Sequence, residues 1–157
     1  MSIAEIKNWF ELAIPSPTKD NQRVQLGVHT EEFKEMLDVI DKDVDDGRFK
    51  TSLDSCGAVV HRIAEVLKKN KEFTLLITDR TEFLDSLCDQ IVTAIGVGHM
   101  YGFDILGALQ EVSRSNTSKF ENGKPLFDEN GKIKKGDNYF KPNLSKFLGT
   151  DPAIKSV

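Results

Sequence analysis

The stretch TEFLDSLCDQIVTAIGVGHMYG, residues 81–102, decides the fold class that we predict for this chain. Residues 84–100 are nearly all apolar or small, and Asp79 or Thr81 provides a cap for a helix that begins there. Gly102 provides its end. Because its apolar residues are not confined to one stripe, we expect this helix to be the buried helix at the centre of the fold.

Four more helices are predicted, at about residues 3–12, 24–41, 52–69 and 105–113. Apolar residues at steps of three and four indicate a helix with one buried face. The expected helix boundaries are, in chain order, Ser2 and Pro15 for the first helix, the DVDDG stretch at 43–47 for the second, Asn70 for the third and Asp104 for the last. Residues 15–22, PSPTKDNQ, are expected to form a loop.

Beyond Asn116 the sequence changes to charged and turn-forming residues. The pair Asn130-Gly131 lies between KPLF and KIKK, which is typical of a two-residue hairpin with a type I′ turn. We therefore expect a short β-hairpin or extended arm at about residues 124–140. The predicted fold is all-α: one domain over residues 1–157, with a helical bundle of about five helices over residues 1–120 and the arm over 121–157.

Length and composition fit one ordinary globular domain. The chain has 157 residues, 29% charged and 39% apolar, with a net charge of −4 and a pI of about 5.4. This balance argues weakly against nucleic-acid binding, and no apolar run approaches membrane-spanning length. Residues 1–15 lack the basic start and long apolar core of a signal peptide, so we expect a cytoplasmic protein. Cys56 and Cys88 lie in apolar helical contexts and are expected to be buried free thiols.

Two groups of acidic residues occur at helical spacing: Glu31, Glu32 and Glu35 in one helix, and Glu82, Asp85 and Asp89 in another. Residues three or four apart share a helix face, so each group forms a stripe. Carboxylates brought together repel unless cations lie among them, and hard oxygen ligands suit Mg²⁺ or Mn²⁺. The alternative is two solvated helix faces, because 25 of the 157 residues are acidic and such groups arise by chance.

The segment EVSRSNTSKF, residues 111–120, combines hydroxyl groups, an amide and two cations at the end of a predicted helix. Arg114, Asn116 and Lys119 could bind phosphate oxygens there. The alternative is a capped helix end whose cations interact with the helix dipole. Residue types alone do not separate these two interpretations.

Four stretches together resemble the MazG-like all-α nucleoside triphosphate pyrophosphohydrolases, and among them the short single-domain forms often found in phages. They are QLGVHTEEFKE at 25–35, LDSLCDQIVTAIGVGHMYGFD at 84–104, EVSRSNTSKF at 111–120 and GKPLFDENGKIKKGDNYFKPNL at 123–144. The first contains the EExxE motif of that family. The resemblance covers nearly the whole chain, and it implies a host-cytoplasmic enzyme if the chain is phage-encoded.

The resemblance implies hydrolysis of a (deoxy)nucleoside triphosphate between its α and β phosphates, giving the monophosphate and pyrophosphate. The cofactor would be Mg²⁺, with Mn²⁺ as an alternative. The implied metal ligands are Glu32, Glu35, Asp85 and Asp89. Glu31, Glu32 and Glu35 are the catalytic candidates, and Glu31 would hold a further ion or orient the attacking water. The literal ExxD reading, with Glu82 and Asp85 as the second motif, stays open.

The same resemblance implies a set of substrate-binding residues. Asn116 and Lys119 would bind phosphate or sugar, and Gln25 would face the base, although a structural amide is about as common. Lys132, Lys135 and Tyr139 on the arm would close over the nucleotide, or else form ordinary surface. Family members form dimers or tetramers, so we expect self-association, without a nucleic-acid or membrane partner.

Two rival functions remain from the sequence. One is a related enzyme, either restricted to one base such as dUTP or dCTP or acting on phosphoribosyl-ATP. The other is a non-catalytic helical interaction module that kept the scaffold. The retention of acids in both groups argues against the second.

Overall fold

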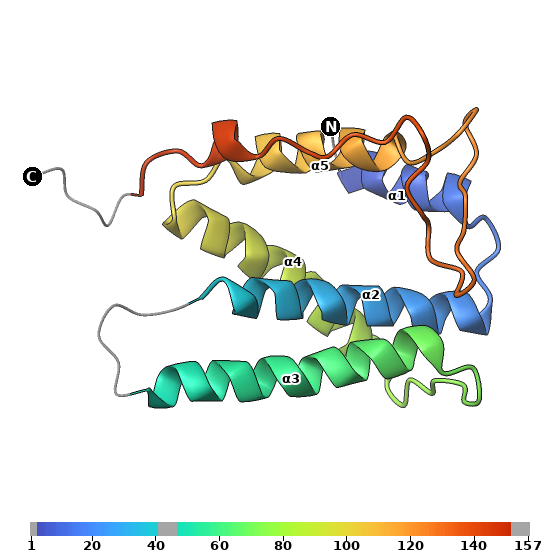
Figure 1. Cartoon of the computed structure of the whole chain (residues 1–157), viewed down its shortest axis with the longest axis horizontal. Helices are drawn as coiled ribbons and strands as arrows, with labels where there is room; N and C mark the ends of the chain where they lie inside the picture. The colour runs from blue at the N-terminus through green and yellow to red at the C-terminus, as the bar shows by residue number, and fades with distance from the viewer. Residues whose placement is uncertain (1–2, 41–46, 152–157) are drawn as a thin grey trace, which may run out of the picture. The chain divides into compact units, whose positions relative to one another are not determined.

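The computed structural model describes residues 3–40 and 47–151, and within them the chain is helical (Figure 1). Its elements are α1 (Ile3–Ala13), α2 (Lys19–Asp38), α3 (Arg48–Lys69), α4 (Arg80–Met100), α5 (Ile105–Thr117) and a short 3₁₀ helix, η1 (Ser145–Phe147). These described residues form no strand. The prediction of an all-α fold with five α-helices is therefore confirmed.

Capping residues explain most of the helix boundaries. Asp79 accepts hydrogen bonds from the backbone of Thr81 and Glu82 at the start of α4, and Asp104 accepts one from Gly107 in α5, as predicted. Asn70 follows the last residue of α3, also as predicted. The predicted cap Ser2 and residues 43–46 of the predicted DVDDG terminator lie outside the described residues.

Several boundaries were predicted wrongly. The second helix ends at Asp38 instead of about residue 41, and the third begins at Arg48 instead of Ser52. The second helix begins at Lys19 instead of Val24, because Thr18 and Asn21 form a capping box inside the segment that we expected to be a loop. The fifth helix continues to Thr117 instead of ending at Ser113. Its last turn is compatible with a helix because the Thr117 hydroxyl donates to the carbonyl of Ser113 instead of competing for the helical backbone.

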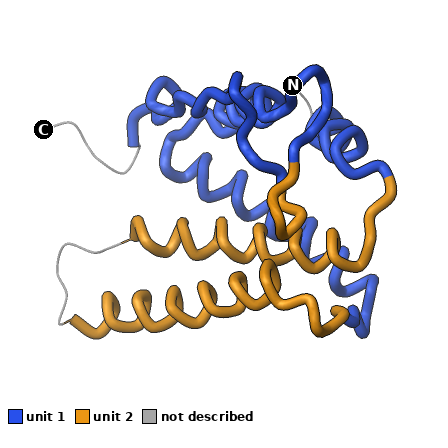
Figure 2. Tube along the Cα trace, turned by 45° about the vertical axis from the view of Figure 1, so that its right-hand side comes forward, with its two compact units in different colours: residues 1–15, 76–126, 133–157 blue, residues 16–75, 127–132 orange. Residues whose placement is uncertain are grey.

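The chain divides into two compact units (Figure 2). Unit 1 comprises residues 1–15, 76–126 and 133–157, and unit 2 comprises residues 16–75 and 127–132. The predicted arm therefore contributes to both units. Its tip, residues 127–132, belongs to unit 2.

Unit 2 is built on an antiparallel pair of helices, α2 and α3. The helices approach closely at Gly27, where a Cβ atom would lie 2.9 Å from Leu67 Cβ and 3.0 Å from the carbonyl oxygen of Ala64. One helix turn away, the buried Arg23 donates a hydrogen bond to the carbonyl of Leu67. This carbonyl belongs to the last turn of α3, so the guanidinium satisfies an acceptor that the helix leaves open.

Unit 1 contains α1, α4, α5 and the C-terminal segment. Gly102, with a φ of 73°, lies between α4 and α5, whose axes differ by 119°. Near this bend Gly98 packs against Ile105. A Cβ atom added to Gly98 would lie 3.1 Å from the Cβ of Ile105. At α1, Trp9 stacks on Phe120, with ring centroids 5.3 Å apart. This stacking ties the first helix of the chain to the end of α5.

The prediction that residues 81–102 form a buried central helix is wrong. Gly98 is the only buried residue of α4, while Leu84, Val92 and Met100 are more than 60% exposed. An apolar helix is buried only where neighbours cover every side, and the described residues cover α4 mainly near its bend. Cys56 and Cys88, expected to be buried, are exposed free thiols.

No single helix among the described residues is both long and apolar enough to cross a membrane. Only α4 and α5 taken together reach that length and composition, and the bend of 119° separates them.

The arm takes the extended form, not the hairpin. Glu121 and Lys124 form an isolated antiparallel bridge through their backbones. The turn at the tip is not type I′. Gly131 has a φ of 78°, but Asn130 does not have the positive φ that a type I′ turn also requires. Instead, Asp128 and Lys132 enclose a three-residue loop, in which the N–H of Gly131 donates to the carbonyl of Asp128 at 3.0 Å.

Candidate functional site

Glu31, the first acid of the α2 group, lies between two lysines. Lys68 of α3 donates to its Oε1 at 2.6 Å, and Lys132 of the arm donates to its Oε2 at 3.1 Å. Partial burial raises the pKa of Glu31, but the hydrogen bonds from both lysines outweigh this effect, so its pKa lies below the ordinary value. Each carboxylate oxygen of Glu31 therefore accepts a hydrogen bond from one lysine, and the carboxylate stays ionised.

Lys68 was missed by the sequence analysis. It is only 9% exposed, and its ammonium contacts Glu31 and, at 2.7 Å, Glu65. Its alkyl chain passes over Gly27, whose missing side chain leaves room for it. Burial lowers the pKa of Lys68, but the hydrogen bonds to both glutamates outweigh this effect, so the net shift is upward. The hydrogen bond that Lys68 donates to Glu65, together with one from Lys69, lowers the pKa of Glu65 to about 2.

The contact of Lys68 with Glu31 depends on how α2 and α3 are aligned, which the sequence does not give directly. Lys68 lies 37 residues from Glu31 in the chain, in a pair of lysines that resembles an ordinary helix end. Gly27 is the one local signal, because a glycine inside a helix often marks a close approach of another backbone.

Glu32 and Glu35 complete the α2 group, and both are exposed. Glu31 is turned towards α3, whereas Glu35 forms no hydrogen bond or ion pair with any residue that the structure describes. One turn further along, Lys34 neutralises Asp38. The helix therefore provides a cation for some of its acids and leaves Glu35 without one in the described residues.

The α4 group, Glu82, Asp85 and Asp89, is exposed along its whole length. Within the described ranges none of these three carboxylates forms a hydrogen bond or ion pair. The group belongs to unit 1, whereas the α2 group belongs to unit 2. No cluster of three or more histidine, cysteine, aspartate or glutamate side chains close enough to hold a metal ion occurs in residues 3–40 and 47–151. The available donors are hard carboxylate oxygens, which fit Mg²⁺ chemically.

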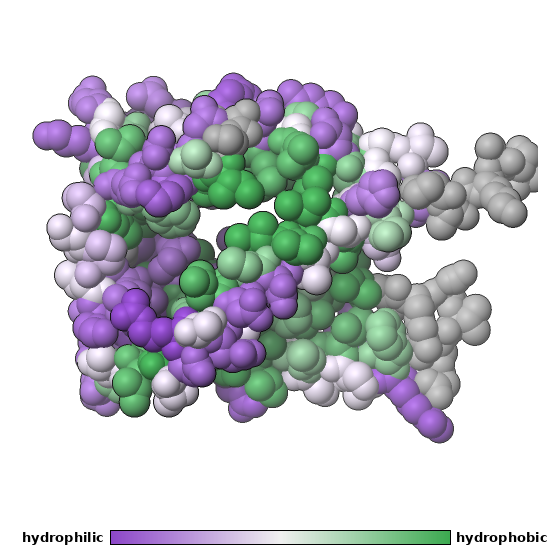
Figure 3. Space-filling model, turned by 180° about the vertical axis from the view of Figure 1, so that it is seen from behind, coloured by the Kyte–Doolittle hydropathy of each residue, from purple (hydrophilic) through white to green (hydrophobic). Residues whose placement is uncertain are grey.

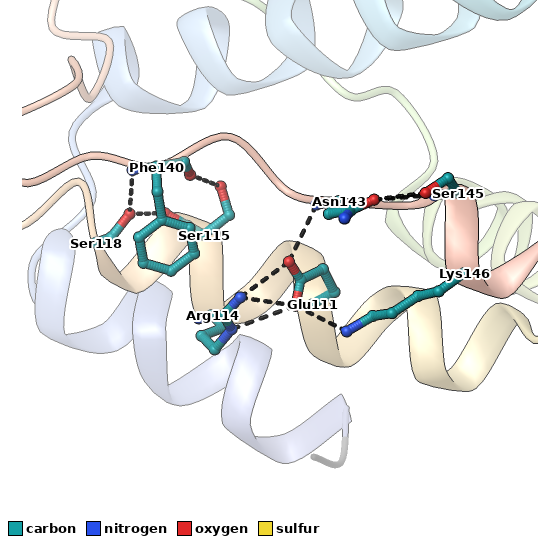
Figure 4. Close-up of polar contacts among 8 residues, drawn as sticks. All are labelled: Glu111, Arg114, Ser115, Ser118, Phe140, Asn143, Ser145 and Lys146. Atoms are coloured by element: carbon teal, nitrogen blue, oxygen red, sulfur yellow. Dashed lines mark hydrogen bonds and ion pairs between the residues drawn. The ribbon is translucent and has the colours of Figure 1, made fainter.

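The segment 111–120 docks the C-terminal segment (Figure 4). The Glu111 carboxylate is buried and accepts hydrogen bonds from the backbone N–H of Asn143 at 3.0 Å and from the Arg114 guanidinium, with Lys146 3.9 Å away. The bond from Asn143, followed by the one from Arg114, holds the pKa of Glu111 below its ordinary value. Arg114 is therefore engaged structurally, which weakens its expected role with phosphate.

Two hydroxyl groups of α5 extend this docking surface. Ser115 donates to the carbonyl of Phe140 at 2.7 Å, and Ser118 accepts the N–H of the same residue at 3.1 Å (Figure 4). The Arg114 guanidinium lies 4.4 Å from the centre of the Phe140 ring. These side chains bind the backbone of the C-terminal segment, a role that neither sequence interpretation included.

The remaining predicted substrate-binding residues lie on α2, on α5 and on the arm, in both units. Asn116 and Lys119 are half-buried at the end of α5, where the N–H of Lys119 donates to the carbonyl of Asn116 at 3.1 Å. On the arm, Lys135 lies 4.8 Å above the Tyr139 ring. Gln25 is exposed on α2. The contact between Lys132 and Glu31 joins a predicted substrate-binding residue to a predicted catalytic one.

Comparison of the chain with protein-family models, curated proteins and solved structures gave no match. A functional interpretation therefore depends on the residues themselves. Within the described residues, Glu35 on α2 and Asp85 and Asp89 on α4 form no ion pair with a cation. Glu31 is ionised and lies between two lysines.

Proposed function

We propose that this chain is a metal-dependent nucleoside triphosphate pyrophosphohydrolase of the MazG-like type, converting a (deoxy)nucleoside triphosphate to the monophosphate and pyrophosphate. The observation that carries the proposal is the uncompensated charge of Glu35, Asp85 and Asp89 within the described structure. Like charges three or four residues apart destabilise a helix by about 0.2–0.5 kcal/mol per pair. A cation that binds to such a helix face relieves this repulsion and so stabilises the helix.

Glu32 and Glu35 on α2, and Asp85 and Asp89 on α4, would hold Mg²⁺, or Mn²⁺ in its place, with Glu82 as the alternative ligand. Bound Mg²⁺ would neutralise charge on the phosphates and lower the pKa of an attacking water. Glu31 would orient that water, or hold a further ion, and Lys68 keeps it ionised for this role. Each of these roles uses a carboxylate as an oxygen ligand or a proton acceptor.

The cations of the arm and of α5 would bind the substrate. Lys132 is the strongest candidate because it already lies 3.1 Å from the proposed catalytic Glu31. Lys119 and Asn116 would bind phosphate or sugar, Lys135 and Tyr139 would cover the nucleotide, and Gln25 would contact the base. A lysine bond to phosphate is worth about 1.5–3 kcal/mol, so loss of Lys119 would raise KM measurably.

We also propose that the chain self-associates to a dimer or tetramer. Phe49, Cys56 and Ile63 of α3 recur every seven residues. Val59 and Val66 follow Cys56 and Ile63 by three residues, and all five are exposed. This is the a/d pattern of a helix that packs on another helix. The adjoining face, which includes Gly57, Ala64 and Leu67, is buried in unit 2. Figure 3 shows how widely hydrophobic side chains reach the surface on one side of the molecule.

The test is a panel of canonical and modified nucleoside triphosphates with Mg²⁺, followed by product analysis. Monophosphate and pyrophosphate in equal amounts are the expected products. Diphosphate and orthophosphate would indicate a different hydrolase. Turnover of dUTP or dCTP alone, or of phosphoribosyl-ATP alone, would identify one of the related enzymes.

A second candidate function, a non-catalytic helical interaction module, is favoured by the exposed apolar residues of α3 and α4. The same panel separates the two candidates. An interaction module turns over no nucleotide, although it self-associates through the same apolar residues. An enzyme does both.

A further inference from the structure

We infer that Lys132 is a shared cation, which fastens the arm tip to Glu31 in the free protein and transfers to the triphosphate when the substrate binds. The inference rests on the proposed function and adds a substrate-dependent movement to it. It concerns the arm tip, residues 127–132, and the face of α2 and α3 on which the tip lies. All of these residues belong to unit 2.

Two lysines attach the arm tip to the helices. Lys132 of the tip donates to Glu31 Oε2 at 3.1 Å, and Lys71, beyond the end of α3, donates to the carbonyl of Glu129 at 3.3 Å. The tip itself is shaped by Asp128, whose Oδ1 accepts the N–H groups of Asn130 and Lys132 at 2.9 Å. The turn therefore keeps its own shape, and the two lysine bonds help to hold it on the helices.

The two cations on Glu31 differ in how firmly they are held. The Lys68 side chain is 11% exposed and is bonded at 2.6 Å to Glu31 and at 2.7 Å to Glu65. The Lys132 side chain is 44% exposed and has the longer bond. An exposed ion pair contributes little to stability, because water and salt screen it. Lys68 is therefore the fixed partner of Glu31, and Lys132 the exchangeable one.

A triphosphate competes directly for the exchangeable lysine. It presents several negative charges, whereas Glu31 presents one that Lys68 already compensates in part. When Lys132 leaves, Glu31 keeps Lys68, so its charge stays paired. Its Oε2 then becomes available to the water or further ion of the proposed reaction. Substrate binding would in this way prepare Glu31 for its role.

The experiment measures two quantities on the full chain: hydrogen exchange of the tip amides without nucleotide, and affinity for a mixture of the four α,β-methylene deoxynucleoside triphosphates with Mg²⁺. The variants are Lys132→Met, Glu31→Gln and the double variant. Two controls match them. Lys134→Met removes a neighbouring arm lysine, and Glu65→Gln removes an acid that contacts Lys68 but not Lys132. Circular dichroism confirms that each variant folds.

In the free protein, Lys132→Met and Glu31→Gln should each speed exchange of the tip amides roughly two- to fivefold, as expected for loss of a partly exposed ion pair, and the double variant should add nothing. Lys134→Met should leave it unchanged. Lys132→Met should weaken analogue binding about tenfold or more. Glu31→Gln should strengthen binding, because it releases Lys132, and this gain should vanish in the Lys132→Met background.

Equal tip exchange in the wild type and Lys132→Met would overturn the inference, and so would an undiminished gain from Glu31→Gln in the Lys132→Met background. Either result in a chain that hydrolyses triphosphates would leave the proposed function intact. A wild-type chain that neither binds the analogues nor turns over any triphosphate would overturn the proposed function, and the transfer of Lys132 with it, even if Lys132→Met loosens the tip.

Discussion

The buried carboxylate of Glu111 accepts a hydrogen bond from the backbone N–H of Asn143, 3.0 Å away, and so joins the middle of α5 to the C-terminal segment (Figure 4). A backbone donor cannot lose its proton or change with residue type. The strength of this hydrogen bond therefore depends on the charge state of Glu111.

This contact predicts acid-dependent release of the C-terminal segment. The pKa of Glu111 is below its ordinary value of 4.5 in the folded protein, so its contribution to stability is present above pH 4.5 and is lost as the pH falls through the folded-state pKa. Protection of the Asn143 amide, measured relative to its intrinsic exchange rate at each pH, should fall over that acidic range. In Glu111→Gln, which keeps an acceptor without the charge, protection should be lower at neutral pH and should change little with acid. A wild-type profile in the variant would contradict this.

Removal of one proposed metal ligand should abolish activity without unfolding the chain. Glu35 is exposed and forms no ion pair in the described residues, so Glu35→Gln should nearly eliminate turnover and leave the circular dichroism spectrum unchanged. Relief of repulsion should keep the melting temperature of the metal-free protein equal or raise it. The matched control is Glu72→Gln, an exposed acid outside both groups. Full activity in excess EDTA would contradict the metal requirement.

The register of the α4 acids can be settled by comparing three variants. Asp85→Asn and Asp89→Asn should each reduce metal-dependent kcat/KM by orders of magnitude, and Glu82→Gln should reduce it less, because Glu82 lies nearer the start of α4. All three carboxylates are exposed, so none of the changes should affect folding. An essential Glu82 with a dispensable Asp89 would support the literal ExxD motif instead.

The close approach of α2 and α3 predicts opposite effects for two glycine substitutions. Gly27→Ala would place a Cβ 2.9 Å from Leu67 Cβ, so it should lower the free energy of unfolding by about 1–3 kcal/mol. Gly57→Ala is the control. Its Cβ would meet only Asp38 Oδ1, at 3.9 Å, so alanine should stabilise the helix by about 0.5–1 kcal/mol. Urea unfolding of both variants measures the difference, and equal signs would refute the packing argument.

The exposed apolar face of α3 predicts self-association that a single charge disrupts. Ile63→Asp would place an unpaired charge in the proposed interface, so the dissociation constant of the oligomer should rise about tenfold or more. Ala58→Asp adds the same charge at an exposed position outside the seven-residue pattern and should leave association unchanged. Sedimentation velocity decides between them. A monomeric wild type would remove α3 as a contact between copies.

Features that depend on neighbouring residues were predictable from the sequence. Asp79 and Asp104 were identified as helix caps because a cap bonds to backbone two or three residues away. The start of α2 was missed even though its cap is equally local, because Thr18 lies in a stretch whose prolines and polar residues resemble a loop. Local signals can therefore compete with one another within a few residues.

Features that depend on distant residues were not predictable. The burial of α4 was wrongly predicted because hydropathy records what a helix can bury, not what covers it. The acidity of Glu31 was recognised, but its partners lie 37 and 101 residues further along the chain. Its environment therefore became visible only once α3 and the arm were in place.

The division of the chain between the two units also sets an order for folding during synthesis. The α2 and α3 helices are complete once Lys69 has emerged from the ribosome, so their hairpin can form early. The first helix emerges before them, yet Trp9 has to wait for Phe120 before its ring finds the partner on which it stacks. The nascent chain thus leaves the Trp9 ring without this stacking partner while α2, α3 and α4 are being synthesised.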